Sequence, residues 1–315
     1  MTLGANSTVA DSPSGSAAPA SPAPAALPAK LALFAADIKL SHTVFAMPFA
    51  LLSTFLAASG WPWLGQLGLI LLCMVTARTV AMASNRLLDA RLDALNPRTA
   101  GRAIPSGGLS RGFFAGVLVA CAIAFIASTA LFGPIYHNWL PLILALPVLL
   151  FLASYPLLKR FTRLCHYYLG AALALAPVCA WIAIKGDVEL PPILMAAAVL
   201  CWTAGFDIIY ACQDCDSDCE TGVVSVPAKL GVARALWVSR ATHIVSLAML
   251  IVLGLSVPQF GALYFTGVAL AGALLVVEHS LVRPHDLSKV GLAFFTVNGI
   301  ISVALGLLGI LDVFF

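Results

Sequence analysis

Long apolar runs alternate with short polar loops from about residue 37 to the end of the chain. Each run is near the ~20 residues that cross a bilayer as a helix. A backbone within lipid must satisfy its own hydrogen bonds, which favours helices. The pattern therefore predicts an all-α, polytopic membrane protein with nine transmembrane helices. The approximate spans are 42–59, 64–85, 112–132, 139–156, 166–184, 190–212, 235–255, 260–280 and 290–312.

The overall composition supports this interpretation. The 315 residues are 61% hydrophobic and only 10% charged, whereas a soluble domain carries about 25% charged residues. The net charge of +3 is too small to indicate a nucleic-acid partner. The high apolar content instead makes the lipid bilayer the expected partner. The eight cysteines lie mostly singly in apolar runs and form no disulfide framework.

The first 29 residues have a different composition. They are rich in Ala, Pro and Ser and contain no Lys or Arg, so they lack the basic region of a signal peptide. We predict a disordered tail over residues 1–29 and one transmembrane domain over residues 30–315.

Basic residues are concentrated in the loops that follow the second, fourth, sixth and eighth runs. The positive-inside rule places these loops and the N-terminus in the cytoplasm of a bacterial inner-membrane protein. The basic residues concerned are Arg86, Arg91, Arg98, Arg102, Arg111, Lys159, Arg160, Arg163, Lys229, Arg234, Arg283 and Lys289.

A first acidic stretch ends the second apolar run. Asn85, Asp89 and Asp93 are four residues apart, so they share one face if the helix continues. Carboxylates at membrane depth are costly, and they usually mark a functional site.

A second acidic stretch ends the sixth run. Asp207, Ala211, Asp214 and Asp218 follow helical spacing and form a second predicted stripe. Both stripes end on the cytoplasmic side. Two such stripes repel each other unless cations lie between them.

An oxygen-only ligand set favours Mg²⁺, which often bridges carboxylates to substrate phosphates. The candidate ligands are Asp89, Asp93, Asp214 and Asp218, with Asn85 assisting. Arg98, Arg102, Lys159 and Arg160 are suited to phosphate oxygens. Such a site could bind a diphosphate and stabilise it as a leaving group, with a long hydrocarbon in the apolar body below.

Three further polar residues lie in or near apolar runs. Arg78 falls inside the second run, and we expect it to pair with a carboxylate in the bundle. His42 and His166 lie near the cytoplasmic ends of the first and fifth runs. Each could contact substrate or cap a helix.

Three stretches resemble one known family. Residues 85–93, NRLLDARLD, resemble the NxxxDxxxD motif of the UbiA superfamily of intramembrane prenyltransferases, and residues 210–218, YACQDCDSD, resemble its YAxxDxxxD motif. Residues 155–160, YPLLKR, look like the segment that ends the family's fourth helix. The resemblance covers roughly residues 37–312, and nine helices is the family's number.

The resemblance implies a fold and a mechanism. The fold is a UbiA-type bundle with its active site on the cytoplasmic side. Mg²⁺ held by the four aspartates binds a polyprenyl diphosphate, the diphosphate leaves, and an electron-rich aromatic acceptor attacks the allylic carbocation. Tyr155 and Tyr210 would stabilise the cation or orient the acceptor, and Asp207 would serve the acceptor.

The acceptor is less determined than the donor. We expect a hydroxy-aromatic carboxylic acid used in ubiquinone or menaquinone biosynthesis, with 4-hydroxybenzoate and 1,4-dihydroxy-6-naphthoate both suitable. Homogentisate, haem and chlorophyllide are alternative acceptors. A cation-coupled transporter is the alternative from another class, but the acids cluster at one face instead of crossing the midplane. Neither prenyl chain length nor oligomeric state follows from the sequence.

The loop charges yield a topology prediction. Reporter fusions near residues 100, 160, 225 and 285 should report the cytoplasm, because those loops carry the basic residues. A periplasmic signal at residue 100 would contradict both the orientation and an active site on the cytoplasmic face.

Overall fold

The computed structural model describes residues 1–2, 26–39 and 45–315. These residues are helical apart from loops and one isolated bridge between Arg283 and Asp286. The elements in chain order are α1 (Leu27–Asp37), α2 (Met47–Ala58), α3 (Leu64–Leu95), α4 (Arg111–Tyr136), α5 (Leu140–Leu158), α6 (Cys165–Lys185), α7 (Leu190–Ala211), η2 (Cys212–Asp214), α8 (Cys215–Thr221), α9 (Val226–Leu230), α10 (Val232–Ser256), α11 (Ala262–Leu281), α12 (Val290–Leu292), η3 (Ala293–Val297) and α13 (Asn298–Asp312).

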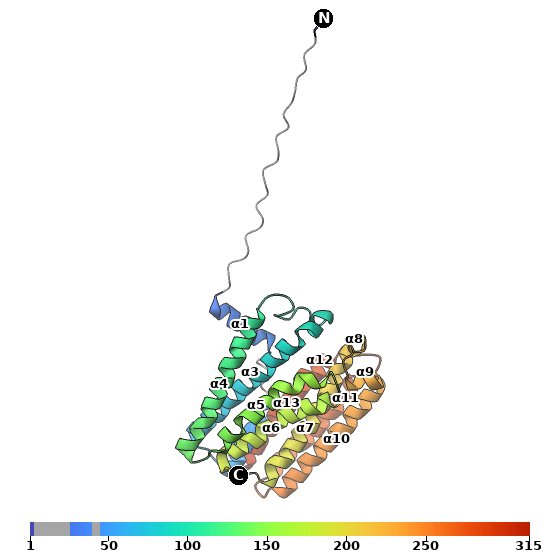
Figure 1. The fold of residues 1–315 in the computed structure, drawn as a ribbon. Helices are drawn as coiled ribbons and strands as arrows, with labels where there is room; N and C mark the ends of the chain where they lie inside the picture. The colour runs from blue at the N-terminus through green and yellow to red at the C-terminus, as the bar shows by residue number, and fades with distance from the viewer. Residues whose placement is uncertain (3–25, 40–44) are drawn as a thin grey trace.

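The long helices run side by side in one bundle, with α1, α8 and α9 at one end and the C-terminus at the other (Figure 1). Helix α7 packs against both α6 and α10, and α3 packs against α4. The predicted all-α membrane fold is confirmed for the described residues.

Eight helical segments are long and apolar enough to cross a membrane, and α7, η2 and α8 count together as one of them. The shorter apolar helix α2 corresponds to the first predicted run, of which residues 42–44 lie outside the described part. Each of the nine predicted runs therefore has a helical counterpart. Helix α3 continues to Leu95, so the first acidic motif lies on a helix.

Helix α1 precedes the first membrane run. It begins at Leu27, three residues inside the predicted tail, whereas residues 3–25 lie outside the described part. Phe34 is buried, and its ring centroid lies 4.9 Å from that of Phe114 on α4. Ile38, at the C-cap of α1, joins the same apolar cluster. This docking places the end of α1 beside the loop that follows α3.

A buried polar chain ties α7, α11 and α13 together. Trp202 Nε1 donates to Asn298 Oδ1 at 2.7 Å, and Asn298 Nδ2 donates to Glu278 Oε1 at 2.9 Å. His243 on α10 also contacts His279 on α11, with 2.9 Å between Nδ1 and Nε2. Buried polar groups must find partners of this kind, so these contacts help to fix how these four helices pack.

Helices α2 and α13 approach each other closely at Gly306. A Cβ atom at this position would lie 2.5 Å from Pro48 Cβ and 3.1 Å from the Pro48 carbonyl oxygen. Small residues at helix contacts allow backbones in membrane bundles to pack closely. Only glycine fits this contact without moving one of the helices.

This contact yields a stability prediction. Gly306→Ala should cost about 1–3 kcal/mol of folding free energy because it overpacks the α2–α13 contact, which thermal unfolding in detergent would detect as a lower Tm. Gly299→Ala is the matched control, because Gly299 lies on α13 with nothing within 4 Å of its added methyl group. Equal Tm values for the two variants would contradict the interpretation.

Candidate active site

The first acidic motif forms one face at the end of α3. Asp89 and Asp93 have side chains only 1% and 7% exposed. Asn85 Nδ2 donates to Asp89 Oδ2 at 2.9 Å, which sets the orientation of that carboxylate. Burial makes an unpaired carboxylate costly, so each aspartate needs a cation nearby.

Asp89 has its counter-charges at the end of α5. Lys159 Nζ lies 2.6 Å from Asp89 Oδ2, and Arg160 Nη2 lies 3.9 Å from Asp89 Oδ1. Arg160 also donates to the carbonyl oxygen of Leu88 at 2.7 Å. The YPLLKR segment thus contacts the first acidic motif directly.

Two arginines of the loop after α3 pair with the other aspartates. Arg102 Nη1 lies 2.7 Å from Asp93 Oδ1. Arg98 binds Asp214 with two nitrogens, Nε at 2.8 Å from Oδ1 and Nη2 at 2.6 Å from Oδ2. Asn96 Nδ2 also donates to Asp214 Oδ1, at 2.9 Å. This loop therefore bridges the two acidic motifs.

The second predicted stripe is not continuous, which corrects the sequence prediction. Helix α7 ends at Ala211, the 3-10 turn η2 spans Cys212–Asp214, and α8 starts at Cys215. A 3-10 turn has 3.0 residues per turn instead of 3.6 and so changes the register. Asp214 and Asp218 line a polar cavity, whereas Asp207 does not.

This polar cavity has a volume of about 150 Å³. Eight of the predicted site residues line it, which brings both acidic motifs and three cations together. They are Asn85, Asp89, Asp93, Arg98, Arg102, Lys159, Asp214 and Asp218. The predicted residues Arg160, Tyr155, Tyr210, His166 and Asp207 lie outside this lining, and His42 lies outside the described residues.

Two carboxylate oxygens in this cavity lack a hydrogen-bond partner. Asp89 Oδ1 and Asp93 Oδ2 are buried and accept no hydrogen bond from any described residue. No three His, Cys, Asp or Glu side chains in the described ranges are close enough to hold an ion together. A cation that keeps water and shares ligands with a phosphate fits such a set of oxygens.

Basic side chains gather at the cavity, where Arg98, Arg102 and Lys159 are part of the lining. Burial lowers the pKa of the Lys39 ammonium, and nearby Arg102, Arg98 and Arg86 lower it further. Burial also acts to lower the pKa of Arg98, but the hydrogen bond to Asp214 and the nearby charges of Tyr210, Asp214 and Asp93 together raise that pKa. Clustered cations of this kind attract an anion to the cavity.

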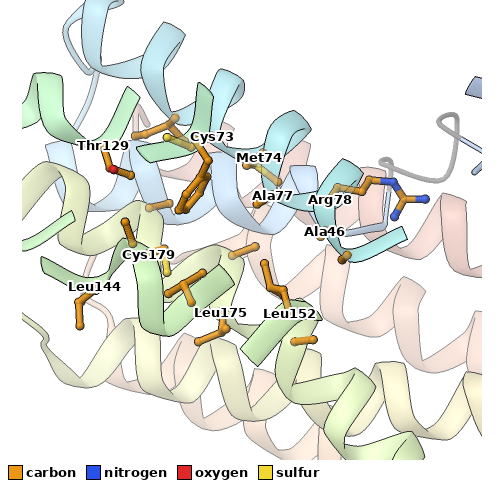
Figure 2. Close-up of a pocket in the computed structure, with 18 of the residues that line it drawn as sticks. Ala46, Cys73, Met74, Ala77, Arg78, Thr129, Leu144, Leu152, Leu175 and Cys179 are labelled. Atoms are coloured by element: carbon orange, nitrogen blue, oxygen red, sulfur yellow. The ribbon is translucent and has the colours of Figure 1, made fainter. Parts of the chain in front are cut away.

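A second cavity, of about 210 Å³, lies among α3, α4, α5 and α6 and is almost entirely apolar (Figure 2). Tyr155 lines it, one helical turn before Lys159 of the polar cavity. Arg78 lines it two turns before Asn85. The apolar cavity thus lies inward of the polar one along α3 and α5.

Arg78 stands at one end of the apolar cavity, away from Leu144 and Cys179 (Figure 2). Its Nη2 donates to the carbonyl oxygen of Lys39 at 3.2 Å, and its buried Nε has no partner among the described residues. The expected pairing with a carboxylate is therefore wrong, since no described acidic side chain forms a salt bridge with Arg78. A buried guanidinium with an unused donor can bind an anionic ligand.

Sequence reasoning missed a chain of contacts that starts at α1. Asp37 Oδ2 accepts from Arg86 Nε at 2.8 Å, and Asp37 Oδ1 accepts from the backbone N–H of Ala103 at 2.7 Å. Arg86 Nη1 donates to Asn85 Oδ1 at 2.8 Å. Asp37 thereby sets the orientation of Asn85, which bonds Asp89. The only signal in the sequence was an acidic residue shortly before the first run.

The remaining predicted residues surround the cavities. Tyr210 Oη accepts from Arg98 Nη1 at 2.9 Å, and its ring lies 4.2 Å from Phe294. His166 Nδ1 lies 2.7 Å from Asp207 Oδ2.

The sequence profile of the UbiA prenyltransferase family matches residues 46–300, most of the chain. The chain belongs to this family. It is similar to the 4-hydroxybenzoate octaprenyltransferase of Chromohalobacter salexigens, with 30% identity over 237 residues that cover 74% of this chain and 76% of the relative. The enzyme of the same name from Vibrio atlanticus is 31% identical over 259 residues, 81% of this chain and 88% of that one.

Solved structures of UbiA homologues share the fold. The apo homologue from Aeropyrum pernix K1 has a TM-score of 0.77 and 31% identity, covering 87% of this chain and 98% of its own. A homologue from Archaeoglobus fulgidus bound to DMAPP and Mg²⁺ has a TM-score of 0.65 and 18% identity, covering 89% and 98%. The predicted family, UbiA-type bundle and polyprenyltransferase activity are confirmed, and this UbiA-family chain is an integral membrane protein.

Proposed function

We propose that this UbiA-family enzyme transfers a polyprenyl chain from polyprenyl diphosphate to a hydroxy-aromatic carboxylic acid of the 4-hydroxybenzoate type, in respiratory quinone biosynthesis. The observation that carries the proposal is a polar cavity, with carboxylate oxygens that lack hydrogen-bond partners, next to an apolar cavity along α3 and α5. Relatives named 4-hydroxybenzoate octaprenyltransferase support this acceptor class. UbiA homologues bound to DMAPP or GPP with Mg²⁺ support the donor.

The cofactor in this proposal is Mg²⁺. Asp89, Asp93, Asp214 and Asp218 would hold it, and the free oxygens of Asp89 and Asp93 are the ligands already available. The bound ion would neutralise negative charge on the diphosphate and so make it a better leaving group.

The basic residues change partners when the diphosphate enters. Arg98, Arg102 and Lys159 now neutralise Asp214, Asp93 and Asp89. Once cations take over the carboxylates, these side chains are free to bind phosphate oxygens, and Arg160 stands beside Lys159. The same charges thus stabilise the site before and after substrate binding.

The apolar cavity receives the prenyl chain. Its lining is apolar apart from Tyr155, Arg78 and Thr129, so it would keep water away from an allylic cation. The Tyr155 ring, which lines this cavity one turn before Lys159, would stabilise that cation. Tyr210, whose hydroxyl binds Arg98, packs against Phe294 and would provide a second aromatic ring near the diphosphate.

Arg78 is our candidate for binding the acceptor's carboxylate. Its free Nε belongs to a planar group that binds carboxylates with two hydrogen bonds. Both 4-hydroxybenzoate and 1,4-dihydroxy-6-naphthoate carry the carboxylate and hydroxyl that such a site requires. His42 remains a predicted acceptor or phosphate contact. We place the active site and the N-terminus on the cytoplasmic side of a bacterial inner membrane.

One assay tests the proposed function. Purified enzyme with Mg²⁺ and labelled geranyl diphosphate should prenylate both acids, and a competition between them ranks the two. Prenyl transfer to a porphyrin or chlorin but to neither acid would defeat the quinone assignment. Ion flux in proteoliposomes without prenyl transfer would instead favour a transporter.

A matched pair of variants tests the metal ligands. Asp214→Asn should lower kcat at least about 100-fold, because it removes a charge from the site that stabilises the leaving group. Asp216→Asn should keep normal activity, since Asp216 is exposed and does not line the polar cavity. Activity should also require divalent metal in the wild type. Near-normal turnover by Asp214→Asn in excess Mg²⁺ would refute the ligand assignment.

A further inference from the structure

His166 on α6 and Asp207 on α7 form a closely bonded pair. His166 Nδ1 lies 2.7 Å from Asp207 Oδ2, and the His166 side chain is 3% exposed. The backbone N–H of Val226 points at His166 Nε2 from 3.2 Å. A backbone N–H only donates, so Nε2 accepts and Nδ1 carries the proton that Asp207 receives as a hydrogen bond. Val226 therefore fixes the tautomer and the ring orientation of His166.

Asp207 retains one oxygen for a ligand. Its side chain is 22% exposed, and Oδ1 has no hydrogen-bond partner in the part of the chain that the structure describes. Asp207 lies one helical turn before Tyr210, whose hydroxyl binds Arg98 of the polar cavity. Its partner His166 lies one turn before Leu169, which lines the apolar cavity. The pair is therefore close to residues that border each of the two cavities.

We infer that Asp207 is the base for the hydroxyl group of the aromatic acceptor, and that His166 is the positioning residue that presents it. This inference rests on the proposed function, because it requires a hydroxy-aromatic acceptor. A phenol becomes a stronger carbon nucleophile as its O–H proton is withdrawn. A positioned carboxylate within hydrogen-bond reach can withdraw that proton as a general base.

The proposed step balances. The bond between the prenyl carbon and the diphosphate oxygen breaks, and its electron pair leaves with the diphosphate. The ring carbon next to the hydroxyl forms the new C–C bond as the hydroxyl proton moves to Asp207 Oδ1. The ring carbon then releases its own proton to the diphosphate, and the oxygen takes its proton back from Asp207.

One segment connects this pair to the diphosphate side. The backbone N–H of Val224 donates to the Lys159 carbonyl oxygen at 2.6 Å, and that of Val223, which lines the polar cavity, donates to the Asp218 carbonyl oxygen at 2.9 Å. Val226, two residues after Val224, holds His166. The segment 223–226 therefore touches both the polar cavity and the acceptor base. Binding of the diphosphate and presentation of Asp207 are mechanically linked through it.

Conservative variants separate the two hydrogen bonds of His166. In His166→Asn the amide nitrogen replaces Nδ1 and still donates to Asp207. In His166→Gln the amide reaches the Nε2 position, and the bond to Asp207 is lost. Asp207→Asn removes the base itself. His243→Gln is the control, because His243 is equally buried and also contacts α7, through the Trp202 carbonyl, but lies outside the proposed site.

The experiment measures kcat and KM for each substrate with 4-hydroxybenzoate and with its more acidic analogue 3-fluoro-4-hydroxybenzoate. Asp207→Asn should lower kcat with 4-hydroxybenzoate by about 10²–10⁴-fold. His166→Gln should approach that loss, and His166→Asn should lose less. The KM for geranyl diphosphate should stay within about twofold of wild type. The variants' deficit should shrink with the more acidic acceptor, which needs its base less.

A purely structural role predicts a different result. Equal deficits with both acceptors, a deficit matched by His243→Gln, or wild-type kcat in Asp207→Asn would overturn the inference while leaving the proposed function intact. If the wild-type enzyme prenylates neither acid, the proposed function fails, and this inference fails with it.

Discussion

The pairing of aspartate carboxylates with lysine and arginine side chains is the constraint on which this structure depends. Asp89, Asp93 and Asp214 lie at one end of the membrane bundle, where an uncompensated charge costs several kcal/mol. Each is met by a lysine or arginine from another segment. The loop after α3, the end of α5 and the second motif are therefore drawn to one point. In the proposed function, these are the same contacts that a diphosphate would replace.

The sequence predicted the features that follow from the spacing of apolar residues and from the free-energy cost of placing charge at membrane depth. Asp89 and Asp93 were recognisable because acidic residues four apart at the end of an apolar run are too costly to be incidental. The apolar runs themselves specified the bundle, since lipid leaves a chain few alternatives. Which cation meets which carboxylate could not be predicted, because loops of similar charge compete for each pair.

Other features had no local signal. No glycine or proline marks the turn at Cys212–Asp214, so the break in the second stripe follows from packing rather than propensity. Helix α1 is short and borders an Ala/Pro-rich stretch, which hid it from a composition-based prediction. Arg78 was expected to find an acid, yet it meets a carbonyl oxygen at the edge of an apolar cavity. Such pairings depend on contacts between segments far apart in sequence.

The docking of α1 has a consequence for how the protein is made. Ribosomes produce α1 first, but its partners Ala103 and Phe114 follow some 65 to 85 residues later. Asp37 can therefore bond Arg86 and the following loop only after α3 and that loop have been made. Orientation of the first acidic motif is therefore a late event in biogenesis. A nascent chain that stalls before α4 lacks the Phe34–Phe114 contact that docks α1 beside the first acidic motif.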